Sequence, residues 1–268
     1  MLSNFDMDSS TSPLVLLHGL AMSAGAWREV IPLVSQHHQV HAPTADGHRG
    51  GLPVDRHPVT MTHMVDAAER YLDERGLDRP HLAGNSIGGF VAIELARRHR
   101  AASVCAFSPV GFWTSGDGYQ KRAFGRLQRG VTMGRLSRPV LPVVYKSATL
   151  GRLIFRDIAY RGDCISAARA LEINDDGIGC TVVKDLCADM SGADSVIARL
   201  DPIPCPITIV WGQRETLLPS GAYGKTRIPQ ATIRSLPDVG HVPMLDDPDL
   251  VAHTILAVTT AWDAREEL

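Results

Sequence analysis

The chain has 268 residues, of which 44% are hydrophobic and 21% are charged. These proportions are those of ordinary globular proteins, and they exclude a disordered or collagen-like chain. The formal net charge of -2 at pH 7 gives the molecule as a whole no field that would recruit nucleic acid. We therefore expect a compact, enzyme-like protein without a nucleic-acid partner.

The start of the chain and its apolar runs argue against export or membrane insertion. Residues 1–12 are polar and include Asp6 and Asp8, whereas a secretory signal needs a basic start and then an apolar run. No apolar stretch approaches the roughly 18 residues that span a bilayer. We expect a cytoplasmic protein with reduced thiols, without a membrane span, metal or cofactor. The five cysteines form no C-x-x-C pair and are Cys105, Cys164, Cys180, Cys187 and Cys205.

Apolar runs of strand length alternate with helical patterns in the first part of the chain. Thr60 and Gly76 give the second helix its capping residue and its terminating glycine. This alternation is typical of an α/β fold, with a mostly parallel central sheet and helices on both faces. Strands are predicted at 13–17, 39–42, 80–83 and 102–107, and helices at 24–35, 61–75 and 87–99.

The alternation stops after Pro109 and resumes at Ile207. Residues 112–198 show helical patterns without a convincing strand, so we interpret them as an inserted helical cap. Strands are predicted again at 207–211 and 232–236, and a last helix begins at Pro248 after the capping residue Asp247. The sequence thus predicts one α/β core, formed by residues 1–111 and 199–268, with the cap between its two parts.

A candidate nucleophile lies between a predicted strand and a predicted helix. Residues 84–89 read Gly-Asn-Ser-Ile-Gly-Gly, which fits the G-x-S-x-G turn that presents a serine on a tight strand-to-helix bend. Glycines suit the positions around Ser86, because larger side chains would collide with the neighbouring strand and helix. A serine hydroxyl is a poor nucleophile at neutral pH and needs a base oriented by a third group.

His241 is the candidate base, since it follows the last predicted strand in a glycine-containing loop. The chain order of serine, acid and then histidine places the base in this region. With these motifs the chain resembles the α/β-hydrolase fold enzymes over nearly its full length. His18-Gly19 after the first strand is similar to the HG loop of that family. The resemblance implies an oxyanion hole formed by the backbone N–H groups of Leu20 and Ile87.

The candidate acid departs from the family pattern. Residues 211–219 resemble the W-G-x-x-D-x-x-x-P segment of the family, but Glu215 stands where aspartate is usual. Glutamate serves as the third member of the triad in some relatives. Nearby Asp238, Asp246 and Asp247 fit turn and helix-cap positions better, so we predict a triad of Ser86, His241 and Glu215.

Three further features follow from the resemblance. The family has a two-stranded hairpin before the HG strand, and because only about a dozen residues precede that strand here, we expect the sheet to be shortened at this edge. His18 is expected to support the oxyanion loop through hydrogen bonds instead of transferring protons. Asp46 resembles the acidic residue of a D-x-x-G loop and is interpreted as a loop-stabilising carboxylate.

The resemblance implies a serine hydrolase that cleaves a small-molecule carboxylic ester through an acyl-enzyme, in the ester hydrolase class EC 3.1.1. An alternative is carbon–carbon bond hydrolysis of a ring-cleavage diketone, because the G-N-S-x-G-G elbow is similar in such relatives. Haloalkane dehalogenases and epoxide hydrolases of the family need aspartate at the elbow, and position 86 is serine. A ligand-binding, receptor-like protein on the same scaffold is the alternative outside enzymes.

Charge within the predicted cap leaves one more possibility open. Residues 118–161 contain ten Lys and Arg residues and the single acid Asp157. Such a run is usually a solvated helix surface. Its functional interpretation is an esterase or thioesterase acting on an acyl group carried by an acidic carrier protein, with the basic cap as the docking surface.

Overall fold

The computed structural model describes residues 12–113, 118–190, 196–197, 203, 205–218 and 228–266. Within them six strands form one sheet in the order β2-β1-β3-β4-β5-β6. Every neighbouring pair is parallel, which confirms the predicted α/β class. The expected shortening of the first sheet edge concerns residues 1–11, which lie outside the described residues. The strands are β1 (Pro13–Leu17), β2 (Gln39–His41), β3 (His81–Asn85), β4 (Ser103–Phe107), β5 (Ile207–Gly212) and β6 (Thr232–Leu236).

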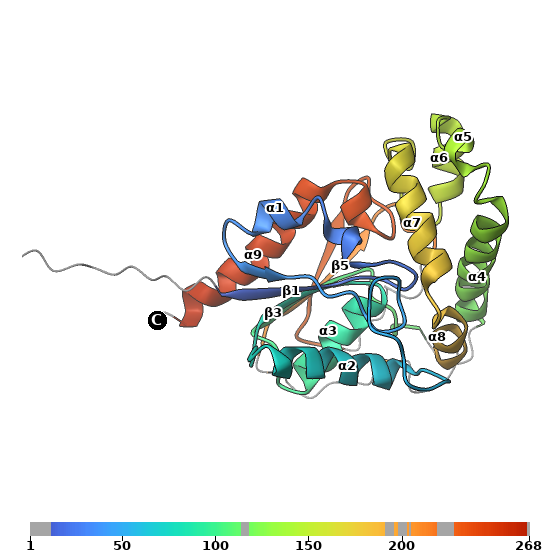
Figure 1. Ribbon diagram of the computed structural model, residues 1–268. Helices are drawn as coiled ribbons and strands as arrows, with labels where there is room; N and C mark the ends of the chain where they lie inside the picture. Colours follow the sequence, from blue (N-terminus) through green and yellow to red (C-terminus); the bar gives the residue numbers. More distant parts are fainter. Residues whose placement is uncertain are drawn as a thin grey trace, which may run out of the picture.

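Helices cover both faces of this sheet (Figure 1). On one face, α3 (Ile87–Arg97) packs on β3 and β4, and α2 (Met61–Glu74) packs on α3. On the other, α9 (Pro248–Glu266) packs on β4 and contacts α1 (Ile31–Val34). The strands β4 and β5 are buried on both faces because helices cover them from two sides, which is why their sequences are mainly apolar.

Most predicted helix starts agree with the structure. The Thr60 hydroxyl caps α2 by accepting a hydrogen bond from the His63 N–H, and the Asp247 carboxylate accepts one from Leu250 at the start of α9. The helix predicted over 24–35 is wrong. Its place is taken by a 3-10 turn, η1 (Ala24–Trp27), and the separate short helix α1. Pro32 has no N–H to bond the preceding turn, so one continuous helix cannot pass through it.

Between β4 and β5 the described residues form helices and no strand, as the sequence predicts for this insertion. Figure 1 shows these helices beyond the carboxyl ends of the parallel strands, the edge at which α/β folds bind ligands. The boundaries 112 and 198 of a separate cap stay a prediction. The inserted helices are α4 (Tyr119–Ser137), α5 (Leu141–Val144), α6 (Ala148–Phe155), α7 (Ala167–Gly179) and α8 (Val183–Asp189).

Two further properties concern the described part of the chain as a whole. None of its helices is long and apolar enough to cross a membrane. Its cysteine thiols are all free, and four of the five are buried. Burial raises the pKa of the thiols at Cys180, Cys187 and Cys205 to about 11, so these groups stay protonated at neutral pH.

Candidate active site

Ser86 lies on a strained turn between β3 and α3. Its φ of 56° and ψ of -114° are an unusual backbone conformation for a residue other than glycine. A Cβ atom at Gly84 would come within 2.2 Å of the Gly88 carbonyl oxygen, and one at Gly88 within 2.2 Å of the Leu17 carbonyl oxygen. The turn therefore requires both glycines, for the steric reason inferred from the sequence.

Glu215 and His241 form a buried pair at the ends of β5 and β6. The Nδ1 atom of His241 lies 2.7 Å from Oε2 of Glu215, and their side chains are 3% and 0% exposed. The other carboxylate oxygen accepts hydrogen bonds from the N–H groups of Leu217 at 2.8 Å and Leu218 at 3.0 Å. Desolvation by itself would raise the pKa of Glu215, but the His241 contact and the two N–H groups outweigh it and leave that pKa lowered. Glu215 is therefore ionised at neutral pH.

The other carboxylates near His241 bind elsewhere. Asp238 pairs with Arg214 at the surface, at 3.0 Å. Asp246 accepts hydrogen bonds from the N–H groups of Gly240, Tyr160 and Arg161, which join the loop of His241 to the inserted helices. Asp247 caps α9. Among the acids weighed from the sequence, Glu215 alone contacts the imidazole.

Asn85 connects the turn of Ser86 with the loop of His241. Its fully buried Nδ2 group donates to the His241 carbonyl oxygen at 2.8 Å and to the Phe107 carbonyl oxygen at 3.2 Å. These bonds fix the histidine loop and the end of β4 against the elbow. Sequence reasoning did not single out this residue. The signal was its place between Gly84 and Ser86, where a buried amide must find backbone partners.

The two expected oxyanion donors flank the serine. Leu20, Ser86 and Ile87 line one small cavity together. Ile87 is the first residue of α3, so its N–H has no intrahelical acceptor, and Leu20 precedes η1 in the loop after β1. Within the described residues neither N–H donates to a protein acceptor. Both groups are thus available to an anion.

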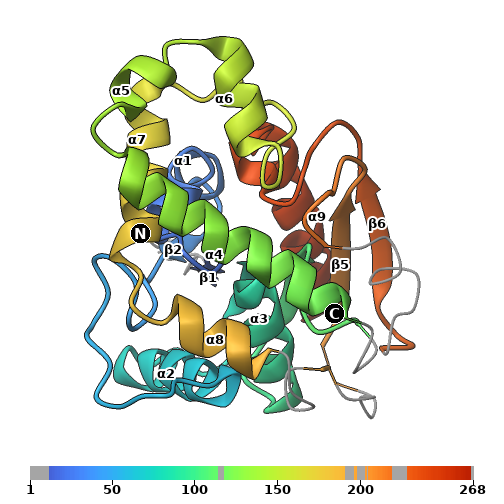
Figure 2. The ribbon, with the colours of Figure 1, turned by 90° about the vertical axis from the view of Figure 1, so that its right-hand side faces the viewer.

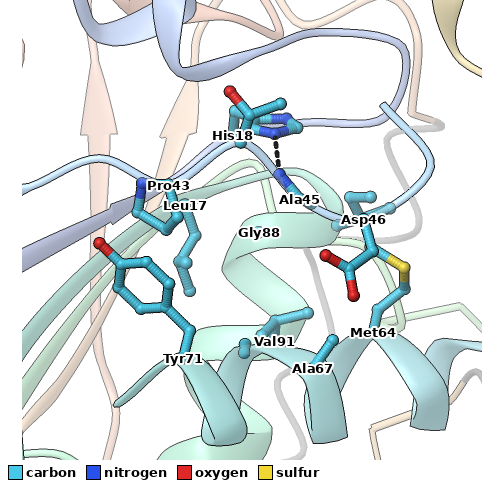
Figure 3. A pocket seen from close by; sticks show the side chains of 13 residues that line it. Leu17, His18, Pro43, Ala45, Asp46, Met64, Ala67, Tyr71, Gly88 and Val91 are labelled. Carbon is cyan, nitrogen blue, oxygen red and sulfur yellow. Dashed lines mark hydrogen bonds between the residues drawn. The ribbon is translucent and has the colours of Figure 1, made fainter. Parts of the chain in front are cut away.

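His18 supports the loop that carries Leu20, as expected. Its Nδ1 lies 2.8 Å from the Gly19 carbonyl oxygen and its Nε2 accepts from the Ala45 N–H at 3.0 Å, a bond visible in Figure 3. These partners define a neutral imidazole with the proton on Nδ1. Burial, with the nearby His48 ring, lowers the pKa of His18 to about 3. His18 is a positioning group and stays neutral.

Behind His18 lies a second, mainly apolar cavity of about 70 Å³, between the HG loop and α2 (Figure 3). Tyr71 and Met64 line it, and the Asp46 carboxylate lies at its side. Asp46 pairs with Arg70 at 3.2 Å, which agrees with its interpretation as a loop-stabilising group. Desolvation raises the pKa of Asp46. Ser86 and His241 do not line this cavity.

Ser86 and His241 share a larger cavity of about 190 Å³. Its floor comes from the HG loop and the elbow, and its walls come from α4, α6 and α7 of the insertion. A mainly apolar wall with a few converging polar groups is the usual composition of a small-molecule site. Its apolar lining includes Leu127, Val131, Tyr145, Ile154, Phe155 and Ile173.

Arg126 on α4 joins the insertion to the loop of Glu215. Its guanidinium donates to the carbonyl oxygens of Thr216 at 2.9 Å and Leu217 at 3.0 Å, and it pairs with Asp157 at 3.3 Å. The loop held in this way is the one whose N–H groups bind the Glu215 carboxylate. The sequence showed Arg126 only as one member of the basic run, because its partners are backbone atoms far away in the chain.

Comparison with known proteins finds hydrolases among the relatives and among the solved structures of similar fold. An epoxide hydrolase, EphH, from Mycobacterium tuberculosis is 27% identical over 206 residues, which are 72% of this chain and 91% of that protein. A pimeloyl-[acyl-carrier protein] methyl ester esterase from Aromatoleum aromaticum is 26% identical over 261 residues, covering 88% and 93% of the two chains. A 2-hydroxy-6-oxo-6-phenylhexa-2,4-dienoate hydrolase from Rhodococcus sp. strain RHA1 has the same fold, with a TM-score of 0.71 and 20% identity over 94% of this chain and 92% of that one.

A parallel α/β sheet with a serine on the turn after its central strand and a histidine after its last strand defines an α/β-hydrolase architecture. The model of the alpha/beta hydrolase family matches residues 14–254, so the match extends from β1 into α9. The chain belongs to this family of hydrolases, as the sequence motifs predicted.

Proposed function

We propose that the protein is a serine hydrolase that cleaves carboxylic esters, with Ser86 as nucleophile, His241 as base and Glu215 as the acid that orients His241. The observation that carries this proposal is the buried 2.7 Å contact between Glu215 and His241 beside the cavity that Ser86 lines. Because Nδ1 donates to the carboxylate, Nε2 of the neutral ring has a free lone pair for the serine proton.

In the proposed reaction, Nε2 of His241 takes the hydroxyl proton as Oγ of Ser86 attacks the ester carbonyl carbon. The N–H groups of Leu20 and Ile87 stabilise the oxyanion. Collapse of the tetrahedral intermediate breaks the ester bond, and the leaving alkoxide receives the proton from His241. Water then gives a proton to the same nitrogen as its oxygen attacks the acyl carbon. Collapse of this second intermediate breaks the bond between the acyl carbon and Oγ of Ser86, His241 returns the proton to Oγ, and the carboxylic acid leaves.

A methyl ester carried by an acyl carrier protein is a second candidate substrate. Its support is the relative from Aromatoleum aromaticum, which acts on such an ester and aligns over most of both chains. The basic residues of the insertion give less support to docking of an acidic carrier protein. Three of them, Arg126, Arg138 and Arg152, form ion pairs with Asp157, Asp175 and Asp163 of the protein itself. A small soluble ester therefore remains the first candidate.

Two other activities have weaker support. Carbon–carbon bond hydrolysis rests on the elbow sequence, since the diketone hydrolase from Rhodococcus has under 25% identity and shares the fold alone. Epoxide opening in this family uses an aspartate at the elbow, and residue 86 is serine, although EphH aligns with this chain. A receptor-like role would leave the Glu215–His241 pair without a chemical task.

A fluorophosphonate probe and short-chain nitrophenyl esters test the proposal. The protein should react with one equivalent of the probe and hydrolyse the esters, and Ser86→Ala should lose both properties while keeping its fold by circular dichroism. The surface substitution Ser137→Ala is the matched control and should leave both properties unchanged. Labelling or turnover at the same rate in Ser86→Ala would refute the assignment.

A further inference from the structure

Exposed aliphatic side chains gather on one part of the insertion. Seven of the ten exposed large hydrophobic residues among those described lie between positions 133 and 154. Figure 2 shows α4, α5 and α6 on the same side of the molecule. We call these seven residues the α4–α6 patch: Met133, Leu136, Val140, Val143, Leu150, Leu153 and Ile154. Exposed apolar groups that gather in this way mark an interaction surface.

Helix α6 is apolar on two faces, and the protein covers one of them. Gly151 and Phe155, four residues apart, are buried on the inner face. Leu150, Leu153 and Ile154 lie on the opposite face with exposed fractions of 42%, 55% and 44%. Apolar side chains of a helix normally face the interior of a protein. The outer face of α6 therefore lacks a covering partner within the described part of the chain.

The helices α5 and α6 lie side by side, which brings their exposed residues together. The rings of Tyr145 and Phe155 approach to 5.6 Å, and both belong to a buried cluster that also contains Leu141 and Ile173. Val143 of α5 and Leu136 near the end of α4 are 71% and 72% exposed. The patch thus lies over a buried hydrophobic cluster.

The charges around the patch identify the kind of partner. Residues 119–156 contain nine Lys and Arg residues and no Asp or Glu, although Arg126, Arg138 and Arg152 pair with acids that lie outside this range. Arg129, Lys146 and Arg156 are exposed beside the patch residues in the sequence. A symmetric contact between two copies of this surface would set like charges against each other, which opposes association. An anionic surface with an apolar interior is complementary to both properties of this region.

We infer that the α4–α6 patch docks on an anionic lipid surface. The aliphatic side chains enter the boundary between headgroups and acyl chains, and the Lys and Arg side chains contact the lipid phosphates. The end of α4 and the short helices α5 and α6 expose several Leu and Val side chains, which suits this shallow insertion, and no spanning helix is required.

The patch is continuous with the cavity at Ser86. Ile154 belongs to the patch and also lines that cavity, and its neighbour Phe155 lines the same wall. Docking would therefore set the apolar wall of the cavity against the lipid. On the basis of the proposed function, the substrate class is an ester that partitions into lipid and reaches Ser86 without crossing bulk water.

Vesicle sedimentation tests the docking independently of catalysis. The Ser86→Ala protein is mixed with vesicles of phosphatidylcholine that contain about 30% phosphatidylglycerol, and with vesicles of phosphatidylcholine alone. We expect sedimentation with the anionic vesicles that weakens as salt increases. Replacing Leu136, Val143 and Leu153 together by serine should reduce the bound fraction at least about tenfold, since each buried aliphatic group contributes to insertion. Lys146→Glu should also reduce it.

Matched controls use exposed residues outside the patch. Leu52 and Ile233 are 67% and 45% exposed and lie in other parts of the fold, so their double replacement by serine should leave sedimentation unchanged. Lys184→Glu on α8 is the control for charge. Failure of the parent protein to bind anionic vesicles, or equal binding by the triple variant, would overturn the inference. A third outcome would also overturn the inference: the parent protein does not bind vesicles, and its molar mass in solution is that of a dimer whereas the triple variant has the mass of a monomer. The patch would then be a contact between two copies of the chain.

A kinetic arm separates this inference from the proposed function. With the active protein, the triple serine variant should hydrolyse a lipophilic ester dispersed in anionic vesicles at least about tenfold more slowly than the parent does. Its rate on a short soluble ester should be unchanged. If neither ester is cleaved, the proposed function is wrong. The sedimentation experiment does not depend on catalysis, so it still shows whether the α4–α6 patch binds anionic lipid.

Discussion

Glu215 contacts Nδ1 of His241 through one carboxylate oxygen, while two backbone N–H groups bind the other. The arrangement fixes both the position of the carboxylate and the tautomer of the ring. It also explains why glutamate can stand where aspartate is usual, since the longer side chain still ends in a fully bonded, buried carboxylate.

Glu215→Gln should lower kcat by about three to four orders of magnitude, because the amide can stabilise the wrong tautomer of His241 and cannot balance its positive charge. Steady-state hydrolysis of a nitrophenyl ester measures the effect. Asp238→Asn is the control, since this acid is close in sequence to His241 but pairs with Arg214 at the surface. Equal activity of Glu215→Gln and the parent would transfer the acid role to another residue.

Asn85→Ala should reduce both stability and activity. The change removes the amide that binds the carbonyl oxygens of His241 and Phe107. The Phe107 carbonyl oxygen keeps its hydrogen bond from the Ser86 N–H, whereas the His241 carbonyl oxygen loses its bond to Asn85, and a buried carbonyl left unpaired costs about 1–3 kcal/mol. The histidine loop should also lose its fixed position relative to Ser86, so that kcat falls about tenfold or more. Urea unfolding and ester hydrolysis measure the two effects. A stability loss at unchanged kcat would limit Asn85 to a packing role.

Arg126→Met should lower kcat about tenfold, because the loop that bears Glu215 loses its tie to α4. Arg126→Lys should restore little, since one ammonium group cannot reproduce the planar fork that binds two carbonyl oxygens and a carboxylate. The exposed Arg129, one turn further along α4, supplies the control Arg129→Met. Comparable losses in both methionine variants would indicate a general charge effect instead of a positioning role.

Stability should fall in acid partly because of His18. Its pKa is about 3 in the folded protein and near 6.5 in the unfolded chain, so between these values the unfolded state binds the extra proton. The unfolding free energy therefore decreases as the pH falls through this window, by about 1.4 kcal/mol per pH unit from this group. His18→Gln should flatten the dependence by that amount in urea titrations between pH 6 and pH 4.

The control for this prediction is His253→Gln, which replaces an exposed histidine of α9. Its pH dependence should follow that of the parent. If His18→Gln also followed the parent, the acid sensitivity would have to come from other buried groups, such as His48, whose pKa is likewise lowered by desolvation.

The sequence by itself predicted the α/β class, which the structure confirms, and it predicted Ser86, His241 and Glu215 for the candidate site. Hydrophobic runs identify buried strands, and glycines around Ser86 mark a turn that tolerates no larger side chain, so both can be read locally. The sequence also placed His241 after the last strand by chain order. The prediction of one helix over residues 24–35 was wrong. The apolar pattern of this segment favours a helix, but Pro32 lacks the N–H that a continuous helix needs at this position.

Only the tertiary structure decided which distant groups meet. The choice of Glu215 over Asp246 depends on which carboxylate faces the imidazole and which binds backbone N–H groups. Asn85 and Arg126 bind carbonyl oxygens, and backbone acceptors are identical along the chain, so residue types alone do not show which carbonyl groups these side chains bind. The same holds for the basic residues of the insertion. Which of them form ion pairs within the protein and which stay exposed beside the α4–α6 patch depends on distances in space, which only the packing of the helices sets.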